Sequence, residues 1–223
     1  SVAEKELLAT LSVFRGGFTA VAVSEISHTT PLDLIRLCNH SLVRRSANSS
    51  RYELHDLTRQ FAARKLALDP LKQTESEKQH TIYYLRIISQ ETRSLVHKEP
   101  IAAFERLLKD FDNIRFAWEN GFAHRLISQL QDAIQGFANY HIRAGNPRDM
   151  INILQRNLAL LGNALPAPKE ALLRLALLTI KGYLLSRLHD KEAEAVTKES
   201  LSLAKRINSP YLLALNYCVR GWN

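Results

Sequence analysis

The sequence contains few of the residues that cross-link or interrupt a fold. Two cysteines, eight glycines and seven prolines occur among 223 residues. Cys38 and Cys218 lie far apart and form no CxxC pair, which argues against a disulfide scaffold or a clustered zinc site and suggests buried free thiols in a reducing compartment. Since helix-favouring residues are abundant and β-branched runs are scarce, we expect a mainly α fold.

Long apolar segments are also missing. No apolar run approaches the roughly 20 residues that span a bilayer, and no basic-then-apolar leader opens the chain. We therefore expect a cytoplasmic protein with no membrane partner. The formal net charge of +8 suits an acidic partner, but lysine and arginine are spread along the whole chain, so the charge is equally typical of solvated helix faces.

Known catalytic motifs are absent from the sequence. There is no GxxxxGK[ST] loop to hold nucleotide phosphates, no HExxH and no histidine–cysteine cluster, so no metal site is expected. We expect that these residues alone catalyse no reaction.

Residues 1 to 69 have the pattern of a winged-helix domain. Helices are predicted in "EKELLATLSVF", from a Thr19 cap through Ile26, and from Pro31. The stretches "SLVRR" and "RYELH" alternate polar and apolar residues like the strands of a hairpin. Asp56 is then predicted to cap a further helix, which carries Leu57 and Phe61 on one face.

Helices are predicted throughout the rest of the chain. We assign 70–125 to a helical linker or packing region and 126–223 to tetratricopeptide-like repeats, so the fold class is a mainly α chain with a winged-helix domain followed by an α-helical solenoid. Gly182 and Gly221 lie 39 residues apart, each followed by an aromatic residue. Small residues from Ala193 onward would let antiparallel helices approach closely. An ordinary helical bundle is the alternative.

Three stretches together resemble a known family: "LSVFRGGFTAVAVSEI", "LVRRS" followed by "RYELHDLTRQFAARKL", and "FERLLKDFDNIRFAWENG". They resemble the region after the nucleotide-binding module in STAND signal-transduction ATPases, the class of the NB-ARC proteins and of the LuxR-type and SARP-type transcription regulators. The resemblance implies a winged helix, packing helices and a repeat sensor. Because the first predicted helix and the last repeat look incomplete, we expect a fragment of a longer protein.

The resemblance also implies a candidate site. In that family the winged helix ends in a Met-His-Asp motif, and Leu54, His55 and Asp56 stand in its place. His55 would reach the β-phosphate of bound ADP, and Asp56 would orient the turn. ADP or ATP with magnesium would then bind the intact protein, and no cofactor would bind these residues alone. The alternative is that His55 only packs or hydrogen-bonds at the start of a helix.

The expected partners are a nucleotide-binding module in cis and a protein or small-molecule effector on the helical repeats. The rival function is that of a winged-helix DNA-binding transcription factor with a helical dimerisation region, in which Arg44, Arg45 and Arg51 beside the wing would contact phosphates. We favour the sensor function because the helix from Pro31 is too apolar to read bases. An adaptor whose repeats bind a peptide is a third possibility.

Overall fold

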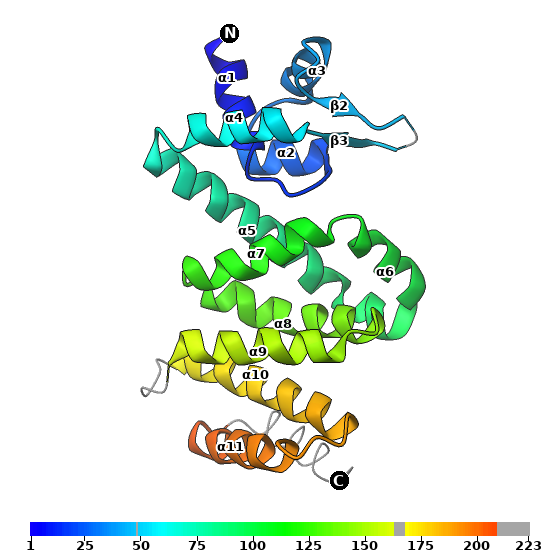
Figure 1. Cartoon of the computed structure of the whole chain (residues 1–223), viewed down its shortest axis with the longest axis vertical. Coiled ribbons are helices and arrows are strands. Elements are labelled where there is room, and N and C mark those ends of the chain that lie inside the picture. The colour runs from blue at the N-terminus through cyan, green and yellow to red at the C-terminus, as the bar shows by residue number, and fades with distance from the viewer. Residues whose placement is uncertain (48, 163–167, 209–223) are drawn as a thin grey trace. The chain divides into compact units, whose positions relative to one another are not determined.

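The chain is mainly α-helical in the computed structural model, which describes residues 1–47, 49–162 and 168–208 (Figure 1). The predicted fold class is confirmed in this respect. The chain divides into two compact units: unit 1 comprises residues 1–88 and 105–124, and unit 2 comprises residues 89–104 and 125–223.

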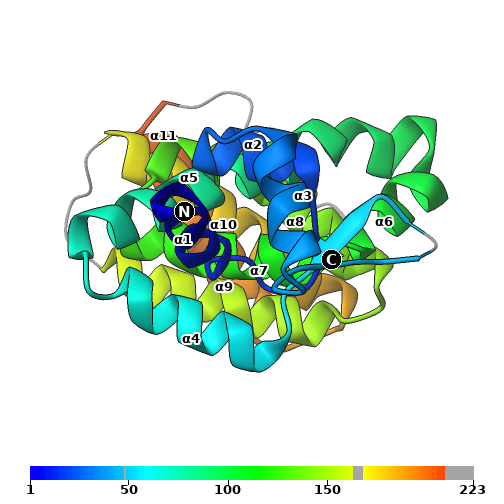
Figure 2. The same cartoon turned by 90° about the horizontal axis from the view of Figure 1, so that it is seen from above.

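Unit 1 begins with helices and strands in the predicted order. The three predicted helices are α1 (Val2–Leu11), α2 (Ala20–Ser27) and α3 (Pro31–Asn39). The Thr19 hydroxyl caps α2 by accepting from Ala22 N at 3.2 Å. The predicted hairpin consists of β2 (Arg44–Arg45) and β3 (Arg51–Glu53), and it projects away from α1 and α4 (Asp56–Leu66) in both views (Figures 1 and 2).

One strand of unit 1 was not predicted. The two-residue β1 (Phe18–Thr19) pairs antiparallel with β3, so the sheet has the order β1-β3-β2. A strand of two residues is too short to show alternation in the sequence, and its pairing partner lies more than thirty positions away.

The aromatic core of unit 1 draws on helices that the sequence assigned elsewhere. The rings of Phe14 and Phe18 stack at 4.5 Å, and Tyr84 of α5 (Pro70–Arg93) meets Phe14 edge-on. Ile114 and Trp118 of α7 (Phe111–Ala123) are also buried. Residue 70 lies inside unit 1, in which α5 and α7 bury side chains.

Helix α4 buries a different face from the one that its larger apolar residues suggest. Ala62 and Leu66 are buried and α4 packs against α1, whereas Leu57 is 70% and Phe61 56% exposed. Cys38 of α3 is a half-buried free thiol, and burial raises its pKa. Cys218 lies outside the described residues.

Unit 2 is built from successive packed helices. After the π-helix η1 (Ser94–Lys98) and the start of α6 (Pro100–Leu108), it contains α8 (Ile127–Arg143), α9 (Pro147–Leu161), α10 (Pro168–Arg187) and α11 (Ala193–Arg206), each in contact with the next (Figure 1). No helix among the described residues is long and apolar enough to cross a bilayer.

The predicted close approach of helices through small residues is confirmed between α10 and α11. A Cβ atom added at Gly182 would lie 3.0 Å from Thr197 Oγ1. One turn away, the hydroxyls of Thr179 and Ser200 are 2.9 Å apart. Gly221, the predicted repeat partner of Gly182, lies outside the described residues.

Candidate functional site

His55 occupies the turn between β3 and α4. Its ring is exposed, and its Nδ1 accepts a hydrogen bond from the backbone N–H of Leu57 at 3.3 Å. His55 is therefore the N-cap of α4, and Asp56, which we predicted as the cap, is the first residue of the helix. An imidazole nitrogen with a free lone pair can accept from the helix start just as an asparagine oxygen does. This bond leaves Nε2 as the ring nitrogen that carries the proton of the neutral histidine.

Asp56 forms an ion pair within α4. Its Oδ1 lies 2.9 Å from Nη2 of Arg59, and both the hydrogen bond and the charge of Arg59 hold the pKa of Asp56 below its ordinary value. A carboxylate in the first helical turn also suits the positive end of the helix dipole. Asp56 thus fixes Arg59 along the first turn of α4.

A cleft of about 490 Å³ opens beside this turn, entirely within unit 1. It lies between the end of β3, the start of α4, the Gly16–Gly17 turn and one face of α7. Leu54 is half-buried and lines the cleft, as does Asp56. His55 stands between these two lining residues. The charged lining residues are mixed in sign: Arg15, Arg59, Arg115, Glu53, Asp56, Asp112 and Glu119.

Arg15 forms one wall of the cleft and was not predicted as a site residue. Its Nη1 donates to the carbonyls of Ser12 and Val13 at 3.0 and 3.3 Å. These carbonyls lie just after the last turn of α1, where the backbone no longer supplies helical hydrogen-bond donors. Its guanidinium also lies 3.9 Å from the centre of the Phe116 ring. Burial lowers the pKa of Arg15, and the nearby charge of Arg59 lowers it further.

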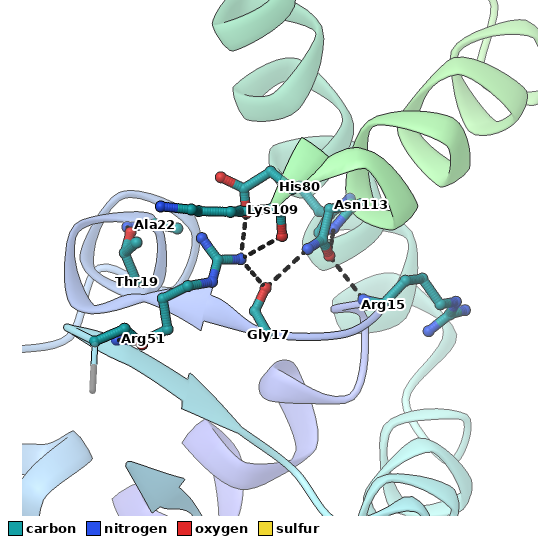
Figure 3. Close-up of polar contacts among 10 residues, drawn as sticks. Arg15, Gly17, Thr19, Ala22, Arg51, His80, Lys109 and Asn113 are labelled. Atoms are coloured by element: carbon teal, nitrogen blue, oxygen red, sulfur yellow. Dashed lines mark hydrogen bonds and ion pairs between the residues drawn. The ribbon is translucent and has the colours of Figure 1, made fainter. Parts of the chain in front are cut away.

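Beside the cleft, the carbonyl of Gly17 is the centre of a partly buried polar network (Figure 3). It accepts from Nη2 of Arg51 at 2.6 Å and from Nδ2 of Asn113 at 3.0 Å. The Oδ1 of Asn113 in turn accepts from the backbone N–H of Arg15 at 2.7 Å. Asn113 is fully buried, and its partly buried hydrogen bonds join α7 to the Gly16–Gly17 turn.

Arg51 is therefore a residue of this network. Besides Gly17, its Nη2 donates to the carbonyl of Lys109 at 2.9 Å and to Oδ1 of Asp110 at 2.6 Å (Figure 3). Burial alone would lower the pKa of Arg51, but the hydrogen bond and charge of Asp110 outweigh it and the pKa is raised. The side chain is only 16% exposed.

The structure separates Arg51 from the other two arginines predicted to contact phosphates. Arg44 and Arg45 are exposed on β2, and the side chain of Arg44 is 83% exposed and 3.6 Å from Glu53. On α3, Leu34 and Leu37 are buried. The hairpin thus presents Arg44 and Arg45 to solvent, whereas Arg51 is bonded within unit 1.

His80 is a second histidine that sequence reasoning missed. It is fully buried among aromatic rings, and its Nε2 lies 3.1 Å from Oδ1 of Asn113. Because Oδ1 is an acceptor, the ring proton is on Nε2, and no hydrogen-bond partner for Nδ1 occurs among the described residues. Burial lowers the pKa of His80 to about 3, so the ring is neutral. Its role is structural.

Comparisons with known proteins give few matches. No family model matches the chain, and no curated protein matches it. Among solved structures, it is similar to a Signal Transduction ATPase with Numerous Domains (STAND) protein with a tetratricopeptide repeat sensor from Pyrococcus horikoshii, at 15% sequence identity and a TM-score of 0.28. The alignment covers 97% of this chain and 46% of that one, so the chain spans less than half of its length.

Proposed function

We propose that this chain is the regulatory and sensor portion of a STAND-type signalling ATPase that acts as a bacterial transcriptional regulator. The observation that carries the proposal is the state of His55: exposed, at the helix N-cap, with Nδ1 accepting from Leu57 so that Nε2–H is the available donor. This is the group that a phosphate oxygen needs as a partner.

The surroundings of His55 favour an anion. The N-terminus of α4 carries the positive end of the helix dipole, which stabilises phosphate groups nearby. Arg59 stands one turn further on, and its ion pair with Asp56 reduces the repulsion that the carboxylate would exert on a phosphate. His55 and the start of α4 would together contact the β-phosphate of ADP, and the nucleotide would be held mainly by a module outside these 223 residues.

The connections of β3 supply a route by which the His55 turn would move the rest of unit 1. Arg51 lies four residues before His55 and is bonded to the Gly17 carbonyl and to Asp110 at the start of α7. A displacement of the turn would strain these bonds. Unit 1 would thus act as a lever whose position differs between ADP and ATP, as a two-state switch requires.

The proposal also assigns roles to the nucleotide-binding module and to unit 2. The module in cis would bind ADP or ATP with magnesium and carry the NTPase chemistry, and the residues described here would catalyse none. The packed helices of unit 2 would receive a protein or small-molecule effector. An intact protein without a GxxxxGK[ST] loop would contradict the proposal.

The sensor role of His55 is tested in the intact protein by ADP release. His55→Ala should accelerate dissociation of a fluorescent ADP analogue by about 10- to 100-fold, because a hydrogen bond to a charged group contributes about 1.5–3 kcal/mol. The matched control is His40→Ala, another exposed histidine of unit 1 at the C-cap of α3. If both variants release ADP at the wild-type rate, His55 is not the sensor.

A second candidate function, direct DNA binding, is supported by the exposure of Arg44 and Arg45 on the wing. It predicts duplex binding by this chain with a steep salt dependence, since each phosphate contact releases counterions. The engagement of Arg51 within unit 1 counts against it.

A further inference from the structure

The cleft beside the His55 turn contains charges of opposite sign that do not pair with one another. Arg15, Arg115, Asp112 and Glu119 line it, and none of these four forms an ion pair with another of the described residues. The volume of about 490 Å³ lies within the roughly 300–1,000 Å³ typical of small-molecule sites. The cleft thus offers a ligand both room and unpaired groups of either sign.

The Arg15 side of the cleft provides donors for an anionic group. Among the described residues only Nη1 of this guanidinium donates to protein carbonyls, and the side chain points away from the Gly17 network (Figure 3). Burial lowers the pKa of Arg15, as does the neighbouring charge of Arg59, and an anion between the two would counteract both effects. The N–H of Gly16 also donates no hydrogen bond within the described residues. A ligand carboxylate would accept from these donors.

One face of α7 provides acceptors for cationic groups. Asp112, Arg115, Phe116 and Glu119 are spaced at i, i+3, i+4 and i+7, so they follow one another along the helix. Oδ2 of Asp112 lies 3.6 Å from the position of a Cβ atom added at Gly16, so this carboxylate lies against the glycine turn. An ammonium group at the turn would pair with Asp112, and a second cation two turns along α7 would pair with Glu119.

The charge of the whole lining favours a ligand that carries both signs and a net positive charge. Three arginines and four carboxylates line the cleft, which gives a formal charge of −1. A simple anion such as acetate would meet more negative than positive charge, and a purely cationic ligand would leave the arginines unpaired. An adjacent carboxylate and ammonium, followed by a chain that ends in a cation, match the arrangement.

We propose that this cleft binds a free basic α-amino acid. The carboxylate of the ligand accepts from Arg15 and from the N–H of Gly16, and its α-ammonium group pairs with Asp112. Its cationic side chain extends along α7 to Glu119. Binding involves unit 1 alone and needs no nucleotide, so this proposal goes beyond the sensor function and does not rest on it.

The probe is L-arginine, titrated calorimetrically into the 223-residue chain without nucleotide. Three analogues each lack one charge: agmatine lacks the carboxylate, N-acetyl-L-arginine the α-ammonium group, and L-citrulline the charge of the side chain. Each analogue should bind at least about tenfold more weakly, since one hydrogen bond to a charged group changes the affinity by about 10- to 100-fold. If L-arginine does not bind, or if any analogue binds as tightly, the assigned ligand class is wrong.

Two variants locate the site. Asp112→Asn and Glu119→Gln keep the size of exposed side chains, so each should leave the Tm unchanged and weaken L-arginine binding about tenfold or more. Glu105→Gln, at an exposed position of α6 outside the cleft lining, is the matched control and should bind like the wild type. Wild-type affinity in both cleft variants would overturn the proposal. ADP release from the intact protein is a separate readout, so a failure here leaves the His55 proposal standing.

Discussion

Replacing Arg51 with methionine should destabilise unit 1 by about 3 kcal/mol. The guanidinium is 16% exposed and its partner Asp110 21% exposed, and Nη2 donates to one carboxylate and two carbonyl oxygens. A hydrogen bond to a charged group contributes about 1.5–3 kcal/mol, and breaking a buried ion pair costs about 3–5 kcal/mol. Since both side chains keep some contact with water, the lower end of the range for a buried ion pair, about 3 kcal/mol, applies.

Urea unfolding followed by tryptophan fluorescence measures this change. The sequence has two tryptophans, and Trp118 of α7 is 1% exposed within unit 1. In a Trp222→Phe background, the signal therefore reports unit 1 alone. Arg45→Met, at an exposed position of the same hairpin, is the matched control and should stay within about 0.5 kcal/mol of the wild type. A double-mutant cycle with Asp110→Asn should give a coupling free energy of about 1–2 kcal/mol.

The refuting result is equally definite. If Arg51→Met costs no more than Arg45→Met, or if the coupling to Asp110 is near zero, Arg51 does not hold the Gly17 network together. The route proposed from the His55 turn to α7 would then fail, and Arg51 would again be available for contacts with DNA phosphates.

Two further predictions concern the packing of each unit. The pKa of His80 is about 3 in the folded chain, against an ordinary value of 6.5. As the pH falls, the unfolded chain therefore binds a proton at this histidine before the folded chain does. The stability that the neutral His80 ring contributes is complete above pH 6.5 and is lost as the pH falls below this value. Relative to His80→Leu, the wild type should lose about 2 kcal/mol of unfolding free energy between pH 7.5 and 5, as measured by urea titrations. Parallel pH profiles for the two proteins would contradict this prediction. Gly182→Ala should lower the Tm although alanine favours helices by about 1 kcal/mol, because its Cβ would lie 3.0 Å from Thr197 Oγ1. In a Thr197→Ala background the same change should raise the Tm, and a decrease there would show that Thr197 is not the obstacle.

Local signals in the sequence predicted much of the fold. Thr19 and Pro31 mark the starts of α2 and α3 because capping and N1 preferences act over three or four residues. The hairpin also follows from alternation within short stretches. The polar stretch that suggested a boundary near residue 70 is the exposed start of α5, whose buried residues begin at Ser76.

The polar interior of unit 1 could not be predicted in this way. His80 and Asn113 are 33 residues apart, and Arg51 and Asp110 are 59 apart, so no local pattern connects them. Arg51 was interpreted as a surface residue because a basic residue beside a hairpin loop is usually solvated. His55 was selected by resemblance to a family motif. The sequence does not decide whether His55 or Asp56 caps α4, because either side chain can accept a hydrogen bond from the backbone at the start of the helix.

The most direct test of the central claim is the distance from His55 Nε2 to the nearest β-phosphate oxygen in a structure of the intact protein bound to ADP. The account predicts a hydrogen bond of about 2.7–3.2 Å, donated by Nε2 while Nδ1 still accepts from Leu57. A His55 ring that faces solvent in the ADP-bound protein, with no contact to the nucleotide, would contradict it.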